Sequence, residues 1–112
     1  MLKSRLNTPR VEWSPGCFSW HLVDDRKASI KIEEIKSGGR SDAHFHTRSA
    51  QFFFILEGQA ALNIENNQYG LNKHEGLEIP LGAKHQILNT GKTSLLFLLV
   101  SIPPVEEDDI QV

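Results

Sequence analysis

The chain has 112 residues, of which 39% are hydrophobic and 23% charged, and its formal net charge is -2. This length suits one domain with its own core, and the charge supplies no basic surface for nucleic acid. The one cysteine, Cys17, excludes a disulfide within the chain and favours a reducing, cytoplasmic setting. We expect no secretory leader in residues 1–9 and no membrane span, because the longest apolar runs, 95–100 and 52–56, are too short.

Short extended segments separated by Gly, Pro, Asn and Asp follow one another along the chain, without a helical period of useful length. Two turns stand out: a Gly-rich turn at 37–39 and a polar turn with hairpin character at 65–68. Many short strands at close spacing predict an all-β fold, namely an antiparallel sandwich, barrel or jelly roll. The predicted strands, in chain order, cover residues 20–23, 28–35, 44–47, 51–56, 59–64, 76–79, 85–88 and 95–101.

Two of these strands are apolar on both faces, those at 52–56 and 95–100. A strand at a solvated surface would show polar residues on one face. One face of each therefore lines a barrel interior, and the other needs a second sheet or another subunit. We predict a homodimer; the alternative is that the opposing sheet and the N-terminal segment around Trp13 and Trp20 cover these faces within one chain.

We expect a single domain over residues 1–112, with an N-terminal arm over roughly 1–15 and an acidic C-terminal tail over roughly 103–112. The tail carries two prolines followed by four consecutive acidic residues, 106–109. Such a charge run is typical of a solvated extended arm.

Three histidines and one glutamine form the most informative pattern. His44 and His46 flank Phe45, so both imidazoles can leave one face of a strand, where side chains alternate with period 2. Gln51 begins the next strand, and His85 follows the turn at 80–82, which can return a distant strand to the first. Three imidazoles and an amide suit a borderline divalent metal ion. Two alternatives stay open: the histidines form hydrogen bonds without metal, or Gln51 bonds a bound water, a substrate or a backbone group.

Because side chains alternate along a strand, the direction of the Gln51 side chain also determines the direction of the side chains at every second residue after it. If Gln51 points inward, Phe53 and Ile55 do so as well. They would form an apolar wall beside the histidines, suited to a compact, partly apolar ligand. The expected pocket-lining residues are Phe53, Ile55, Ile79, Ile87 and Phe97. His21, beside Trp20, is left open between this pocket and solvent.

These residues resemble the two motifs of the cupin superfamily. The first motif is written Gly-x5-His-x-His-x3/4-Glu-x6-Gly and the second Gly-x5-Pro-x-Gly-x2-His-x3-Asn. Gln51 stands at the glutamate of the first motif, and His74 at the first glycine of the second. The remaining matches are Gly38, His44, His46 and Gly58 in the first, and Pro80, Gly82, His85 and Asn89 in the second.

The resemblance implies a cupin-type jelly-roll barrel, also described as a double-stranded β-helix. It also implies a divalent transition metal held by His44, His46, Gln51 and His85, with Fe, Mn, Ni, Zn and Cu all left open. Glutamine brings a neutral carbonyl oxygen where glutamate brings a negative charge. The ion would then keep its full charge and act as a stronger Lewis acid.

The function that follows is a metal-dependent enzyme acting on a small organic molecule, with dioxygenase-type or isomerase-type chemistry. No residue outside the ligand set stands out as a general base, which favours a mechanism in which the metal does most of the work. The alternative is a non-catalytic module that binds or senses a small ligand, because fold does not settle function. Either way the expected partner is a small molecule, without nucleic acid or membrane.

Overall fold

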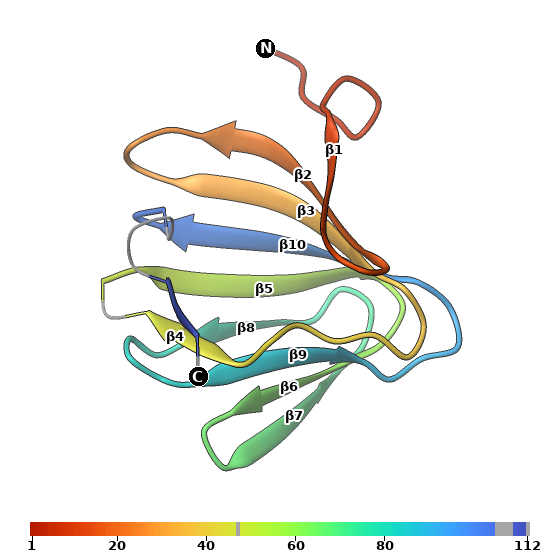
Figure 1. Ribbon diagram of the computed structural model, residues 1–112, viewed down its shortest axis with the longest axis vertical. Helices are drawn as coiled ribbons and strands as arrows, with labels where there is room; N and C mark the ends of the chain where they lie inside the picture. Colours follow the sequence, from red (N-terminus) through yellow and green to blue (C-terminus); the bar gives the residue numbers. More distant parts are fainter. Residues whose placement is uncertain (47, 105–108, 112) are drawn as a thin grey trace.

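The structure, a computed structural model, describes residues 1–46, 48–104 and 109–111, with the backbone alone for His46 and for 109–111. Within these residues the chain forms two antiparallel sheets packed on one another, which confirms the predicted all-β jelly-roll barrel (Figure 1). The six-stranded sheet has the order β1 (Arg10–Ser14), β2 (Cys17–Asp24), β3 (Ser29–Ile35), β10 (Leu95–Ile102), β5 (Ala50–Glu57) and β8 (Gly76–Ile79). The five-stranded sheet has the order β11 (Asp109–Gln111), β4 (His44–His46), β9 (His85–Asn89), β6 (Ala60–Ile64) and β7 (Asn67–Leu71).

The two most apolar strands, β5 and β10, lie side by side in the six-stranded sheet. Their inward residues alternate as the sequence predicts: Gln51, Phe53 and Ile55 are buried, whereas Phe52 between them is 36% exposed. The rings of Phe53 and Phe97 stack at 5.6 Å between centroids inside the barrel. Fully burying such a side chain contributes about 1.5–3 kcal/mol, so this pair anchors the sheet from within.

The outer face of the six-stranded sheet is covered at one end by the N-terminal residues. The guanidinium of Arg10 lies 4.3 Å from the Phe18 ring centroid, and that of Arg5 lies 5.3 Å from the Trp20 ring centroid. Both aromatic residues are buried. The N-terminal residues therefore lie over Phe18 and Trp20 of β2. Phe52 on the outer face of β5, which the segment around Trp13 and Trp20 was expected to cover in the single-chain alternative, remains 36% exposed.

Three strands lie outside the predicted set. β1 lies within the expected N-terminal arm and pairs with β2. β7 begins at Asn67, inside the expected polar turn, because the hairpin turn is limited to Glu65 and Asn66 between the paired residues Ile64 and Asn67. β11 pairs with β4, so residues 109–111 of the expected extended C-terminal tail form an edge strand; residues 105–108 and 112 lie outside the described part.

All three strands lie at a sheet edge and pair through their backbones on one side only. Edge strands need few apolar residues, so composition gives little signal for them. In the described part of the chain, no helix has the length and apolar character needed to cross a membrane.

Candidate functional site

Two of the predicted site histidines meet across neighbouring strands. His44 on β4 is the direct register partner of His85 on β9, and directly opposed residues share one face of a sheet. The ring centroids are 4.9 Å apart and the ring planes meet at 71°. His85 is 2% exposed, whereas His44 is partly buried. The turn at 80–82 thus returns β9 to β4, as the spacing predicts.

The hydrogen bond of His85 selects its tautomer. Nδ1 lies 3.1 Å from the carbonyl oxygen of Ala83, and a carbonyl only accepts, so Nδ1 carries the proton and donates it. The lone pair of the neutral ring then resides on Nε2, which is buried. A ring nitrogen of this kind, oriented by a backbone carbonyl on the other nitrogen, is the usual metal-binding form of histidine.

Gln51 faces the interior from β5 on the opposite sheet. Its Nε2 donates to Ser101 Oγ at 2.9 Å. Its Oε1 is buried and has no hydrogen-bond partner among the described residues. Leaving a buried acceptor unpaired costs about 1–3 kcal/mol, and a cation bound by this oxygen would remove that cost. The amide orientation therefore fits a metal ligand better than a residue that merely satisfies the backbone.

The fourth predicted ligand, His46, is the last residue of β4, and its backbone pairs with Asp109. Its side chain lies outside the described part, so its role as a ligand remains a prediction. Among the side chains that the structure describes, no group of three His, Cys, Asp or Glu residues gathers to hold a metal ion. Of the four predicted ligands, the structure describes the side chains of His44, His85 and Gln51, and it does not describe that of His46.

All five predicted pocket residues are buried: Phe53, Ile55, Ile79, Ile87 and Phe97. They belong to one apolar cluster between the sheets. Phe53 meets the His85 ring edge-on, with centroids 6.0 Å apart. An apolar wall beside His85 is thus present, and whether it contacts a ligand remains a prediction.

His74 explains one departure from the cupin motif. It occupies the position of a motif glycine and has a φ of 68°, a left-handed conformation that histidine adopts more readily than most residues. Its backbone N–H donates to the carbonyl of Ile55 at 2.8 Å. The motif position is therefore a backbone requirement, and His74 meets it without belonging to the predicted ligand set.

Glu33 is a candidate functional residue that the sequence reasoning missed. It lies on the inner face of β3, because its register partners are the buried Phe97 on β10 and the buried Ser19 on β2. Burial raises the pKa of the Glu33 carboxyl to about 7, against the lowering effect of the Lys31 ammonium. A carboxyl of this pKa exchanges protons near neutrality, which is the property of a general acid or base.

One feature of the sequence could have indicated Glu33: the alternation of apolar residues changes face within its strand. Ile30 and Ile32 alternate on one face, whereas Ile35 belongs to the other. The pairing of β3 with β10 is regular, so the backbone itself does not shift. The face that carries Ile35 also carries Lys31 and Glu33, and polar residues on an inward face mark a site.

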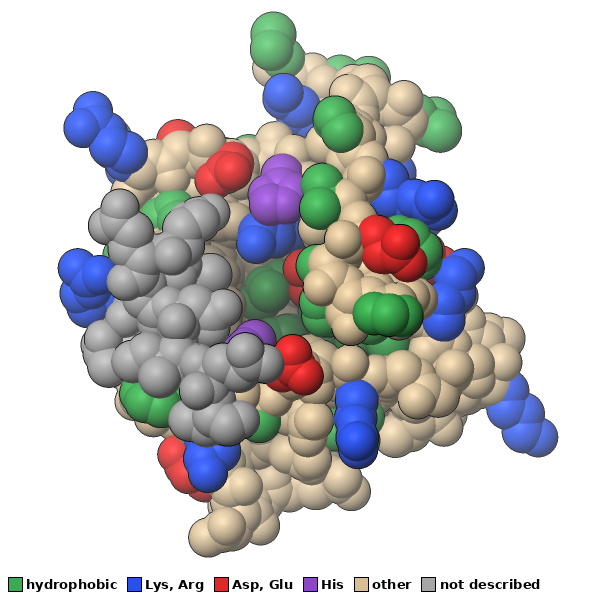
Figure 2. Space-filling view, in the orientation of Figure 1, with side chains coloured by type: hydrophobic (Ala, Val, Ile, Leu, Met, Phe, Trp, Pro, Cys, Tyr) green, Lys and Arg blue, Asp and Glu red, His purple; other side chains and the backbone are tan. Residues whose placement is uncertain are grey.

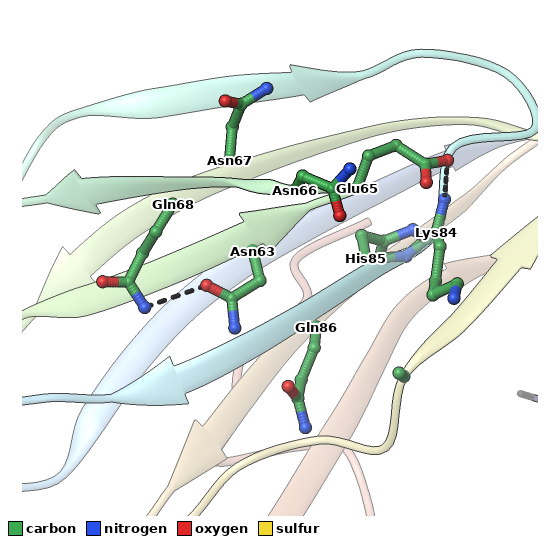
Figure 3. Close-up of a pocket in the computed structure, with 9 residues that line it drawn as sticks. Asn63, Glu65, Asn66, Asn67, Gln68, Lys84, His85 and Gln86 are labelled. Atoms are coloured by element: carbon green, nitrogen blue, oxygen red, sulfur yellow. Dashed lines mark hydrogen bonds between the residues drawn. The ribbon is translucent and has the colours of Figure 1, made fainter.

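A pocket also lies outside the barrel, on the five-stranded sheet near the β6–β7 turn (Figure 3). It has a volume of about 270 Å³ and is lined mainly by amide side chains. Two of these amides are paired, because Gln68 Nε2 donates to Asn63 Oδ1, and the backbone N–H of Lys84 donates to the Glu65 carboxylate (Figure 3). Of the predicted ligands whose side chains the structure describes, His85 lines this pocket and His44 and Gln51 do not. The lining residues are Ala43, Asn63, Glu65, Asn66, Asn67, Gln68, Lys84, His85 and Gln86.

The comparisons with known proteins agree with this architecture. The family model for the cupin domain matches residues 31–101, and the chain belongs to that family. An uncharacterized protein of Methanocaldococcus jannaschii is 28% identical over 86 residues, covering 77% of this chain and 69% of that protein. Other curated relatives are longer: the chain spans 19% of the mannose-1-phosphate guanylyltransferase of Klebsiella pneumoniae, at 31% identity over 80% of this chain.

Solved structures show the same fold at low identity. KdgF from a Halomonas species superposes with a TM-score of 0.85 and 13% identity, over 93% of this chain and 95% of that one. Oxalate decarboxylase from Bacillus subtilis, a protein with Mn(II) centres, superposes with a TM-score of 0.81 and 15% identity, over 96% of this chain and 30% of that one. These likenesses establish the fold.

Proposed function

We propose that this chain is a metal-dependent enzyme that acts on a small organic molecule inside the barrel. The ligands are His44, His46, Gln51 and His85. The observation that carries the proposal is the buried Oε1 of Gln51, which has no hydrogen-bond partner among the described residues and shares the interior with the His44–His85 pair. The Mn(II) centres of the structurally similar oxalate decarboxylase support a transition metal in this fold.

Two kinds of residue support the proposed site: some orient the ligand side chains, and one limits the access of water. Ala83 fixes the tautomer of His85, and Ser101 fixes the amide of Gln51. Phe53 excludes water beside His85. A divalent ion in this ligand set supplies Lewis-acid chemistry, which polarises a carbonyl or carboxyl oxygen of the substrate. A non-catalytic binding module would share these features; the inward placement of the Glu33 carboxyl adds a group that can serve an enzyme as a general acid or base.

Titration of the metal-free protein with Mn²⁺, followed by calorimetry, tests the proposal. We expect saturable binding that is lost when the histidine ligands are replaced. An absence of saturable Mn²⁺, Fe²⁺, Ni²⁺ and Zn²⁺ binding by the wild-type chain would refute the metal site and leave the binding module as the better account.

Replacing Gln51 with glutamate is expected to tighten metal binding at least about tenfold, equivalent to about 1.4 kcal/mol. The carboxylate adds Coulomb attraction that the amide lacks, and the Ser101 hydroxyl can turn to donate to it. Competition with a chelator measures the change. Gln51→Leu is the matched control, because it keeps a similar volume without an oxygen and should weaken binding. Equal retention of metal in all three proteins would show that Gln51 is not a ligand.

We also propose a homodimer formed through the outer face of β5 and β10. Phe52 there is 36% exposed and stacks on Phe54 at 6.2 Å between centroids, and Ile102 at the same end is 56% exposed. A shallow groove of about 180 Å³ runs beside Phe52, Val100 and Ile102. Apolar side chains gathered in this way are typical of a surface that another chain covers.

Sedimentation at micromolar concentration is expected to give twice the 12.6 kDa chain mass. Phe52→Glu should yield the monomer, because it places a charge in the contact. Tyr69→Glu is the matched control, since Tyr69 is 42% exposed on β7 of the other sheet and should leave the dimer intact. A wild-type species at 12.6 kDa would refute the dimer and show that the outer face of β5 and β10 needs no second chain to cover it.

A further inference from the structure

A second group of polar side chains faces the barrel interior from β2 and β3. It consists of Ser19, His21, Lys31 and Glu33, here called the inner polar patch. Ser19 is the register partner of Glu33, and His21 is the partner of Lys31. Across β3 the partners are Phe97 and Leu99 on β10, both buried in the core. Directly paired residues share a face, so the patch and the apolar core belong to the same inner surface.

This surface opens to solvent. Figure 2 shows a hollow over β3 and β10, with hydrophobic side chains at its floor and histidine, basic and acidic side chains around it. Lys31 and Glu33 are each partly buried. They are therefore positioned to meet a molecule that enters the barrel.

Two charged groups of the patch, Lys31 and Glu33, make no side-chain ion pair within the part of the chain that the structure describes. Lys31 forms no ion pair within 4 Å among the described residues, and the Glu33 carboxyl has no side-chain hydrogen bond there. His21 differs, because its Nδ1 lies 3.6 Å from Asp24 Oδ2 and its Nε2 lies 3.4 Å from Ser19 Oγ. Lys31 acts on Glu33 through its charge without forming an ion pair with it. Both groups can therefore contact a bound molecule.

We propose that Lys31 and Glu33 bind a carboxylate group of the substrate, so that the substrate of this enzyme is a small organic acid. Lys31 neutralises the carboxylate, and the protonated Glu33 donates a hydrogen bond to it. Two carboxyl groups that share one proton form a stable pair, as like charges at close range cannot both ionise. A phosphate dianion fits less well, because the single ammonium of Lys31 neutralises only one of its two negative charges.

This inference rests on the proposed metal site, which would hold the other end of the substrate. Lys31, Leu99 and Phe53 lie in one row across three adjacent strands. Strands are about 4.8 Å apart, so the backbones of Lys31 and Phe53 are separated by roughly 10 Å. Phe53 in turn contacts His85. A short acid with a second oxygen group can reach from the patch towards the histidines.

Binding of succinate and of its monocarboxylate analogue butyrate tests the proposal. In the Mn²⁺-loaded wild-type chain, succinate should bind at least about tenfold more tightly than butyrate, because desolvated charge pairs carry that much coupling. Lys31→Met should bring the ratio close to one. Lys73→Met is the matched control: Lys73 is paired with Glu57 at 3.1 Å on the surface, and its loss should leave the ratio unchanged. A ratio that survives in Lys31→Met, or no succinate binding by the wild-type chain, overturns the proposal.

The same measurement with metal-free protein separates the two proposals. One result is that Lys31→Met lowers the ratio of succinate affinity to butyrate affinity while Mn²⁺ has no effect on either affinity. This result supports carboxylate binding by the inner polar patch and refutes the metal site. The opposite result is that Mn²⁺ strengthens succinate binding while Lys31→Met leaves the ratio of succinate affinity to butyrate affinity unchanged. This result supports the metal site and refutes carboxylate binding by the inner polar patch.

The pH dependence of succinate binding supplies an independent readout. Affinity should fall as pH rises through about 7, where Glu33 loses its proton, and Glu33→Gln should remove this fall. His21 is the register partner of Lys31 within the patch, and His21→Gln should leave the fall in place. On β2, burial raises the pKa of the Cys17 thiol, with the charges of Glu33, Asp42 and Glu12 adding to it, so the thiol stays protonated throughout.

In metal-free protein, a carbon NMR titration should place the Glu33 carboxyl near pH 7 and higher in Lys31→Met. Loss of the lowering influence of Lys31 is the cause of the further rise. A Glu33 carboxyl that titrates at its ordinary value in the wild-type chain overturns the role of Glu33.

Discussion

Replacing His85 with alanine is expected to lower metal affinity by at least about a hundredfold, because residues that only orient a ligand already account for about 10–100-fold. His85 is the best oriented of the predicted ligands: Ala83 fixes its tautomer and Nε2 is buried on the inner side of the barrel. His46→Ala should have a comparable effect, because the motif spacing predicts His46 as a ligand. Calorimetric titration with Mn²⁺ measures both changes.

His74→Ala is the matched control for these variants. His74 is exposed, stacks on Phe54 at 6.3 Å between centroids and lies outside the predicted ligand set. It should leave metal affinity unchanged. Circular dichroism of each variant should retain the β-sheet spectrum of the wild-type chain. A folded His85→Ala protein with undiminished affinity would place the metal elsewhere.

Asn89→Ala is expected to destabilise the fold by about 3 kcal/mol, because each lost hydrogen bond of a buried group costs about 1 kcal/mol or more. The amide of Asn89 donates to the carbonyls of Ile35 at 2.9 Å and Thr93 at 2.8 Å. Its Oδ1 accepts from the N–H of Gly91 at 2.9 Å. One side chain thus ties the end of β3 to the turn before β10.

Urea denaturation measures this loss, and Gln59→Ala is the control. Gln59 is exposed and makes one long side-chain hydrogen bond, 3.4 Å to Asn72. Its replacement should change the free energy of unfolding by less than about 0.5 kcal/mol. If Asn89→Ala is as mild as Gln59→Ala, the bonds of Asn89 do not hold β3 in place.

The central strands of the fold were predictable because burial leaves a strong pattern. Phe53, Ile55 and Phe97 belong to runs that are apolar on both faces, and such runs mark strands covered on both sides. The edge strands were not predictable in the same way. Asn67 and Gln68 begin β7, although residues with amide side chains are more typical of turns. They form a strand because their backbones pair with β6.

The candidate site was predictable where the motif spacing matches strand geometry. His44 and His85 meet because β9 pairs with β4 at that register, and Gln51 points inward by the alternation of β5. Glu33 was not predicted because its importance depends on which face of β3 turns inward. That choice is made by pairing with Phe97 on β10, a residue more than sixty positions away in the chain.

The metal content of wild-type protein, purified without affinity metal or chelator, tests the central claim most directly. Elemental analysis should find a divalent transition metal at close to one ion per chain, and the same ion should be absent from His85→Ala. A wild-type chain that carries no such metal, and takes up none when incubated with Mn²⁺, Fe²⁺, Ni²⁺ or Zn²⁺ before desalting, would contradict the assignment of His44, His46, Gln51 and His85 as a metal site.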